Sequence, residues 1–86
     1  MAYLVITNGL DQGQLIELPE GKSILGCDED TEIQIDLSAV SRKHASFEVS
    51  RTRTVIRDLE SSNGTLVNDS PVSDSIELVD GDTIQI

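Results

Sequence analysis

The sequence is poor in the residues that fill large cores or cross-link small folds. It has no tryptophan, and its only aromatic residues are Tyr3 and Phe47, so any core must be largely aliphatic. Cys27 is the single cysteine, which rules out an internal disulfide and a multi-cysteine metal site. The apolar stretch at residues 3–6 is too short for a signal peptide or a membrane span. These absences fit a cytoplasmic domain in a reducing compartment.

Positive charge is also scarce. Six basic residues stand against sixteen acidic ones, for a formal net charge of −10. A chain with this charge repels phosphate backbones and anionic lipid surfaces, which disfavours nucleic acid and membranes as partners. A solvated surface explains the acidity, and the functional alternative is a preference for basic segments of a partner protein.

What the chain does contain is an alternation of apolar and polar residues with a period of two. Ala45, Phe47 and Val49 alternate with Ser46 and Glu48. The same pattern runs through Ile33, Gln34, Ile35, Asp36 and Leu37. Each such run can turn one face to a core and the other to water, as a half-buried strand does.

Turn-forming pairs separate these runs at short intervals, with Asn8-Gly9, Asn63-Gly64 and Asp80-Gly81 the clearest. Many short strands between such turns predict one all-β domain over residues 1–86, a sandwich or a barrel. The strands are expected near residues 3–7, 14–18, 23–26, 33–36, 44–49, 54–59, 65–67, 75–79 and 82–86. The last run reaches Ile86, so we expect either an open strand edge or the N-terminal piece of a longer chain.

Three loop segments hold the unusual polar residues: Gly26-Cys27, Ser41-Arg42-Lys43-His44, and Ser61-Ser62-Asn63-Gly64-Thr65. Ser41 can donate a hydrogen bond and Arg42 offers a planar fork of donors, which together suit an oxyanion such as phosphate. A strand-entry turn with two solvated cations explains the same segment equally well. The amide of Asn63 can both donate and accept, which suits a grip on a peptide main chain. A plain hairpin turn is the alternative there.

Order and spacing give these segments a joint meaning. Along the chain stand Gly26, Ser41-Arg42-x-His44, Asp58-Leu59-x-Ser61-x-Asn63-Gly64-Thr65-x-Val67-Asn68, and Leu78-x-x-Gly81-Asp82-x-Ile84. This arrangement resembles the forkhead-associated (FHA) domain over nearly the whole chain. The resemblance implies a β-sandwich of about ten short strands here, without the family's last strand. It also implies a signalling module that binds phosphothreonine peptides through loops at one end, with no cofactor.

The resemblance also assigns roles by position. Ser41 looks like the serine that contacts phosphate, with Arg42 beside it, and Ser62 stands where a hydroxyl residue helps to hold the phosphate. Asn63 looks like the asparagine that grips the peptide backbone. The resemblance gives structural roles to the remaining matched positions, which are Gly26, His44, Asp58 and Gly64.

Cys27 departs from the family pattern, because an arginine that clamps the phosphate normally follows the glycine at this point. Two charge-assisted hydrogen bonds from such an arginine contribute roughly 1.5–3 kcal/mol each. Their loss weakens phosphate binding by a factor on the order of a hundred to a few thousand. Asp28, Glu29 and Asp30 follow directly and repel a phosphate further.

Two other chemistries are weakly indicated. Ser41, His44 and Asp58 could form a catalytic triad, but no nucleophile-elbow pattern surrounds Ser41 and no oxyanion hole is evident. Asp28-x-Asp30-x-Glu32 lacks the glycine and the glutamate that a calcium loop requires. We therefore expect no catalytic residues and no metal site.

Two functions remain open. The first is a protein-interaction module with a weakened phosphate site, which binds either phosphothreonine weakly or an unphosphorylated, basic partner. The second is a phosphate-independent assembly domain that packs against its own parent chain or a partner. The sequence sets no oligomeric state.

Overall fold

The computed structural model describes residues 2–5, 13–35 and 40–86, and these ranges contain ten strands and no helix. The predicted turn at Asn8-Gly9 and the alternating position Leu37 lie outside the described residues. No segment in those ranges forms a helix long and apolar enough to cross a membrane. The strands are β1 (Ala2–Val5), β2 (Leu15–Leu18), β3 (Gly21–Gly26), β4 (Ile33–Gln34), β5 (Ala45–Val49), β6 (Thr54–Asp58), β7 (Leu66–Val67), β8 (Ser70–Pro71), β9 (Ser75–Leu78) and β10 (Ile84–Gln85).

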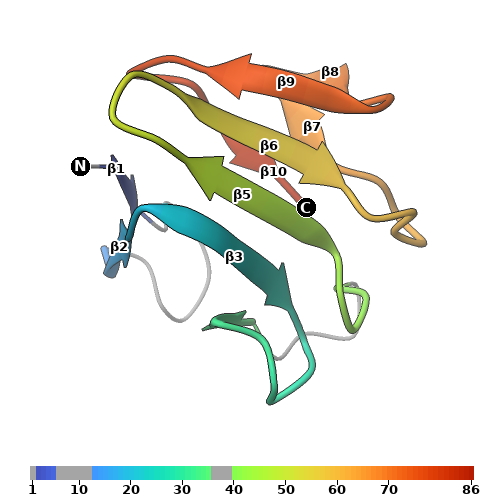
Figure 1. Cartoon of the computed structure of the whole chain (residues 1–86). Helices are drawn as coiled ribbons and strands as arrows, with labels where there is room; N and C mark the ends of the chain where they lie inside the picture. Colours follow the sequence, from blue (N-terminus) through green and yellow to red (C-terminus); the bar gives the residue numbers. More distant parts are fainter. Residues whose placement is uncertain (1, 6–12, 36–39) are drawn as a thin grey trace.

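The strands form three sheets in two layers. One layer is a five-stranded sheet in the order β4-β3-β5-β6-β9. The other consists of the pair β1-β2 and the three-stranded sheet β10-β7-β8, which lies behind the larger sheet in Figure 1. All neighbouring strands are antiparallel except β3 and β4. The architecture confirms the predicted all-β sandwich.

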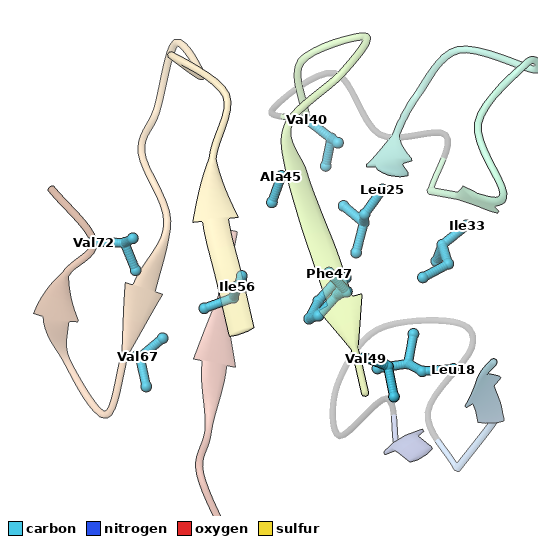
Figure 2. Close-up of a cluster of buried hydrophobic side chains, with 10 residues drawn as sticks. All are labelled: Leu18, Leu25, Ile33, Val40, Ala45, Phe47, Val49, Ile56, Val67 and Val72. Carbon is cyan, nitrogen blue, oxygen red and sulfur yellow. The ribbon is translucent and has the colours of Figure 1, made fainter. Parts of the chain in front are cut away.

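An aliphatic core with one aromatic ring joins the layers. Phe47 of β5 and Ile56 of β6 are directly paired across the larger sheet, and both are fully buried. Leu18 from β2 and Val67 from β7 pack into the same cluster from the opposite layer (Figure 2). The remaining core residues are Leu25, Ile33, Val40, Ala45, Val49 and Val72. Aliphatic side chains, several of them β-branched, therefore fill most of the core around Phe47.

Two expectations about individual strands were wrong. Ser46 was expected on the solvent face of its strand, yet it is fully buried between Ile24 of β3 and Arg57 of β6 in the sheet register. A small side chain between longer neighbours is covered by them, which a period-two pattern does not reveal. Strand β8, which contains Pro71, was not among the predicted strands. The proline is tolerated because β8 is an edge strand of its sheet.

Chain reversals bring the polar segments to one end of the sandwich. Because β5 is antiparallel to both β3 and β6, the end of β3, the start of β5 and the end of β6 lie at the same end of the sheet. This is the right-hand side of Figure 1. The turn at residues 50–53 lies at the opposite end, where a hollow of about 680 Å³ is lined by Arg51, Leu78 and Ile84, among others. That hollow includes none of the polar loop segments.

Candidate functional site

Three segments form the surface that we call the loop face: residues 26–32, 41–44 and 59–65. The first two are joined through their backbones. The N–H of Cys27 donates to the Ser41 carbonyl at 3.0 Å, and the N–H of His44 donates to the Leu25 carbonyl at 2.8 Å. A Cβ on Gly26 would lie 1.8 Å from the Arg42 carbonyl oxygen. Only glycine permits this approach, so Gly26 sets the separation between the two segments.

His44 links the second segment to the third. Its ring is fully buried. Nδ1 accepts a hydrogen bond from the Ser41 N–H at 3.1 Å, and Nε2 lies 2.8 Å from the Gly64 carbonyl oxygen. A carbonyl can only accept, so Nε2 donates in this contact while Nδ1 accepts. Because both ring nitrogens have backbone partners, His44 does not act as a base toward the Ser41 hydroxyl, and the triad geometry is absent.

Ser41 and Ser62 come together although 21 positions separate them. The N–H of Ser62 donates to the Ser41 Oγ at 3.0 Å. The hydroxyl accepts in this contact, so its own proton remains available for another acceptor. The side chain of Ser62 is exposed beside it. The contact thus forms a small donor group at which an anionic oxygen could bind.

Asp58 organises the third segment from within. Its carboxylate accepts hydrogen bonds from the Ser61 N–H at 3.2 Å, the Ser61 Oγ at 2.5 Å and the Thr65 Oγ1 at 2.7 Å. Burial by itself raises the pKa of Asp58, but these hydrogen bonds outweigh it and hold the pKa below the ordinary value of 3.8. Sequence reasoning did not single out Ser61 and Thr65 as its partners. An aspartate three residues before a serine is a local turn signal that could have indicated Ser61.

Asn63 occupies the tip of the third segment and is exposed. Gly64 follows it with a φ of 82°, a value that favours glycine. Glu60 also has a positive φ, 57°, which is uncommon for a residue with a long side chain. The turn therefore presents an amide and a carboxylate at its rim.

Charges of both signs surround these contacts. Arg42 and Lys43 are exposed on the second segment, and they directly follow Ser41 in the sequence. On the first segment, Asp28 accepts a hydrogen bond from the Asp30 N–H at 3.0 Å, forming a compact acidic turn. Among residues 2–5, 13–35 and 40–86, no group of histidine, cysteine or carboxylate side chains could hold a metal ion.

The half-buried side chain of Cys27 packs against the core cluster. The structure brings Cys27, Ser41, Arg42, Ser62 and Asn63 to one end of the sandwich.

Comparison with known proteins identifies the arrangement. Residues 23–86 match the family model described as FHA domain. The chain is an FHA domain. The match includes the entire loop face and most of the larger sheet.

Relatives of this FHA domain include proteins that are named as regulators. It is 38% identical over 85 residues to the glycogen accumulation regulator GarA of Mycobacterium tuberculosis, and the alignment covers 99% of this chain and 52% of GarA. The chain therefore spans about half the length of that relative.

Solved structures show the same fold. A chain from a study of phosphothreonine-dependent FHA domain interactions superposes with a TM-score of 0.88 and 34% identity, covering 96% of this chain and 83% of the other. Mycobacterium tuberculosis EmbR in complex with a low-affinity phosphopeptide gives a TM-score of 0.88 and 34% identity, covering 98% of this chain and 21% of EmbR. This FHA domain thus shares its fold with FHA domains whose interactions depend on phosphothreonine.

Proposed function

We propose that the loop face binds an extended segment of a partner protein, with a phosphate site weakened by Cys27. Ser41, Arg42 and Ser62 contact the phosphate, and Asn63 holds the peptide main chain. The observation that carries this proposal is the hydrogen bond from the Ser62 N–H to the Ser41 Oγ, because it assembles donors from two loops at one point. The exposed guanidinium of Arg42 adds the positive charge that an anion requires.

The weakening follows from the chemistry of position 27. A thiol is only a weak hydrogen-bond donor, whereas an arginine would offer a fork of charged donors. The Cys27 side chain packs against the hydrophobic core, and it carries no charged group that could bind a phosphate. The acidic turn at residues 28–30 adds repulsion on the same side. Arg42 and Lys43 compensate only in part, since they belong to the neighbouring segment.

The same site supports no catalytic function for this chain. The ring nitrogens of His44 are occupied by Ser41 and Gly64, so no general base faces the Ser41 hydroxyl. We therefore assign the domain a role in recognition, and we propose the cytoplasm as its location because its lone cysteine suits a reducing compartment.

An acidic rim favours one alternative, in which the partner is unphosphorylated and basic. Asp28 is half-buried, and Glu29, Asp30 and Glu60 are exposed around the loop face. These carboxylates attract lysine and arginine side chains and oppose an additional phosphate. A domain that binds neither kind of peptide would instead serve in assembly, packing on its parent chain or a partner.

The experiment compares phosphothreonine peptides with their unphosphorylated twins, titrated against the natural chain and against Cys27→Arg. We expect little preference for phosphate in the natural chain. The arginine variant should gain a preference of at least about tenfold, because one charge-assisted hydrogen bond contributes that much. Cys27→Ser is the matched control, since it removes the thiol without adding charge.

Three outcomes are informative. Tight, phosphate-dependent binding by the natural chain contradicts the weakened site. Equal binding of both twins, strengthened by basic residues, supports the unphosphorylated partner. If neither the natural chain nor Cys27→Arg binds any peptide, the assembly role replaces the proposal of peptide binding.

A further inference from the structure

The carboxylate of Asp58 joins two points of the third segment, Ser61 and Thr65. Asp58 ends β6, and its Oδ1 accepts hydrogen bonds from both the Ser61 hydroxyl and the Thr65 hydroxyl. Thr65 is 1% exposed and lies next to β7, so the far end of the loop is anchored in the core. One side chain thus closes residues 58–65 into a ring.

The residues held by Asp58 are direct neighbours of those that contact the second segment. Ser61 precedes Ser62, whose N–H donates to the Ser41 Oγ at 3.0 Å. Thr65 follows Gly64, whose carbonyl lies 2.8 Å from the His44 Nε2. A shift of either neighbour would move the corresponding contact by a similar amount. The position of the carboxylate is therefore transmitted to the Ser41 hydroxyl.

We propose that Asp58 is a positioning residue for ligand binding, which acts through the Ser62–Ser41 contact and aims the Ser41 hydroxyl proton at the ligand. This inference rests on the proposed function of the loop face. The Ser62 N–H donates to one lone pair of the Ser41 oxygen, and the Asp58 hydrogen bonds hold the adjacent Ser61 in place. Without the ring the hydroxyl can turn to other partners, and the donor is no longer preorganised.

Charge alone predicts the opposite effect of removing Asp58. A carboxylate near an incoming phosphate repels it, so Asp58→Asn would strengthen binding if electrostatics dominated. The positioning role predicts weaker binding, because an amide offers one acceptor oxygen to three donors that now use two carboxylate oxygens. The sign of the change separates the two explanations.

The test measures affinity for a phosphothreonine peptide in the Cys27→Arg background, where binding is strong enough to follow. We expect Asp58→Asn to weaken it by about tenfold, the cost of one charge-assisted hydrogen bond. The matched control is Asp82→Asn. Asp82 also accepts hydrogen bonds in a turn, from the Val79 N–H and the Asn68 amide, but at the other end of the sandwich. This control should change affinity by less than about twofold.

A double-mutant cycle with Ser41→Ala separates positioning from a general loss of structure. If Asp58 acts through Ser41, Asp58→Asn should have almost no further effect on affinity once Ser41 is alanine. Additive losses would overturn the proposal, as would unchanged or tighter binding by Asp58→Asn. Should that variant not fold, Thr65→Val removes one hydroxyl donor and leaves the carboxylate in place, and the same cycle is measured with it.

Amide hydrogen exchange of Ser62 supplies a readout that needs no ligand. Exchange should be faster in Asp58→Asn and unchanged in Asp82→Asn. If Cys27→Arg binds no phosphopeptide, the proposed function fails, while Ser62 exchange still decides whether Asp58 positions the loop. Unchanged Ser62 exchange in Asp58→Asn would overturn the inference even if the domain binds peptides.

Discussion

Gly26 shows how much of the loop face depends on the absence of one methyl group. Its backbone approaches the Arg42 carbonyl so closely that a Cβ would lie 1.8 Å from the oxygen. Its φ is not among the positive values found in the structure, so sterics and not backbone conformation require glycine here. The sequence resemblance marked the position, but only the fold identifies what the side chain would meet.

Gly26→Ala should therefore damage both stability and binding. The added methyl group overlaps a backbone atom that has no rotamer freedom, so the strand end or residues 41–43 must move. We expect a loss of about 1–3 kcal/mol in the free energy of unfolding, as for other overpacked sites. Chemical denaturation and titration with the phosphothreonine peptide in the Cys27→Arg background measure the two effects.

Gly81→Ala is the control for a glycine that is needed for its backbone conformation. Gly81 has a φ of 90° and nothing within 4 Å of its ideal Cβ. Its substitution should cost about 1 kcal/mol of stability and leave peptide affinity unchanged. Equal losses of affinity in both variants would show that the methyl group at position 26 has no special effect on the loop face.

At the scale of elements, the short strands β7 and β10 are linked by a side-chain bridge. Asn68 follows β7, and its amide donates to Asp82 at 2.8 Å and accepts from the Thr83 N–H at 2.9 Å. Asp82 also accepts from the Val79 N–H at 2.9 Å. Strands β7 and β10 are paired through Ile84↔Val67 and Gln85↔Leu66. The side-chain bridge extends the contact between the two strands into the adjoining turns.

The bridge gives the domain a predictable dependence on pH. Hydrogen bonds from Val79 and Asn68 hold the pKa of Asp82 below its ordinary value of 3.8. A folded-state pKa below the unfolded value stabilises the native state above the unfolded value, and that contribution is lost as the pH falls through the lower folded value. The natural chain should therefore be more stable than Asp82→Asn near neutral pH, and the difference should diminish as the pH falls below 3.8.

Urea unfolding at several pH values measures this difference. Glu77→Gln removes one exposed carboxylate from β9 and serves as the control for net charge. A difference between the natural chain and Asp82→Asn that persists unchanged at low pH would contradict the assigned role of the carboxylate.

The sequence predicted strands well where apolar and polar residues alternate strongly. It predicted them poorly where a strand is short and contains a residue that disfavours strands. The run from Ala45 to Val49 forms a strand as expected. Strand β8 was not predicted; it has two residues, and one of them is Pro71, which disfavours a strand. The turn before it depends on Asn68 and Asp69, which both have a positive φ, 50° and 70°. Such a turn suits a two-residue hairpin, but local sequence alone did not reveal it.

At the scale of the whole molecule, charge dominates the surface. The formal charge of −10 is carried on a domain with extents of 33 × 27 × 25 Å, so like charges repel across the entire fold at low ionic strength. The ion pair that the structure records among its described residues joins Arg57 and Asp74 at 3.9 Å, and both side chains are largely exposed. Such an exposed ion pair contributes little to the free energy of unfolding.

Salt should consequently stabilise this domain. The Debye length falls from about 30 Å at 0.01 M to about 10 Å at 0.1 M, so the repulsion is screened over this range. We expect the midpoint of thermal unfolding to rise by several degrees, as calorimetry in a NaCl series would show. A falling midpoint would mean that favourable ion pairs outweigh the net repulsion.

The sequence by itself determined the class of fold and the identity of the polar segments, because alternation and turn residues act locally along the chain. Through the family resemblance it also predicted that Cys27 stands at the clamp position. Only the tertiary structure decided how the segments meet. The contacts of Ser41 with Ser62 and of His44 with Gly64 join residues 21 and 20 positions apart. They exist because antiparallel pairing of β3, β5 and β6 returns the chain to the same end. Local sequence carries no direct signal for such distances.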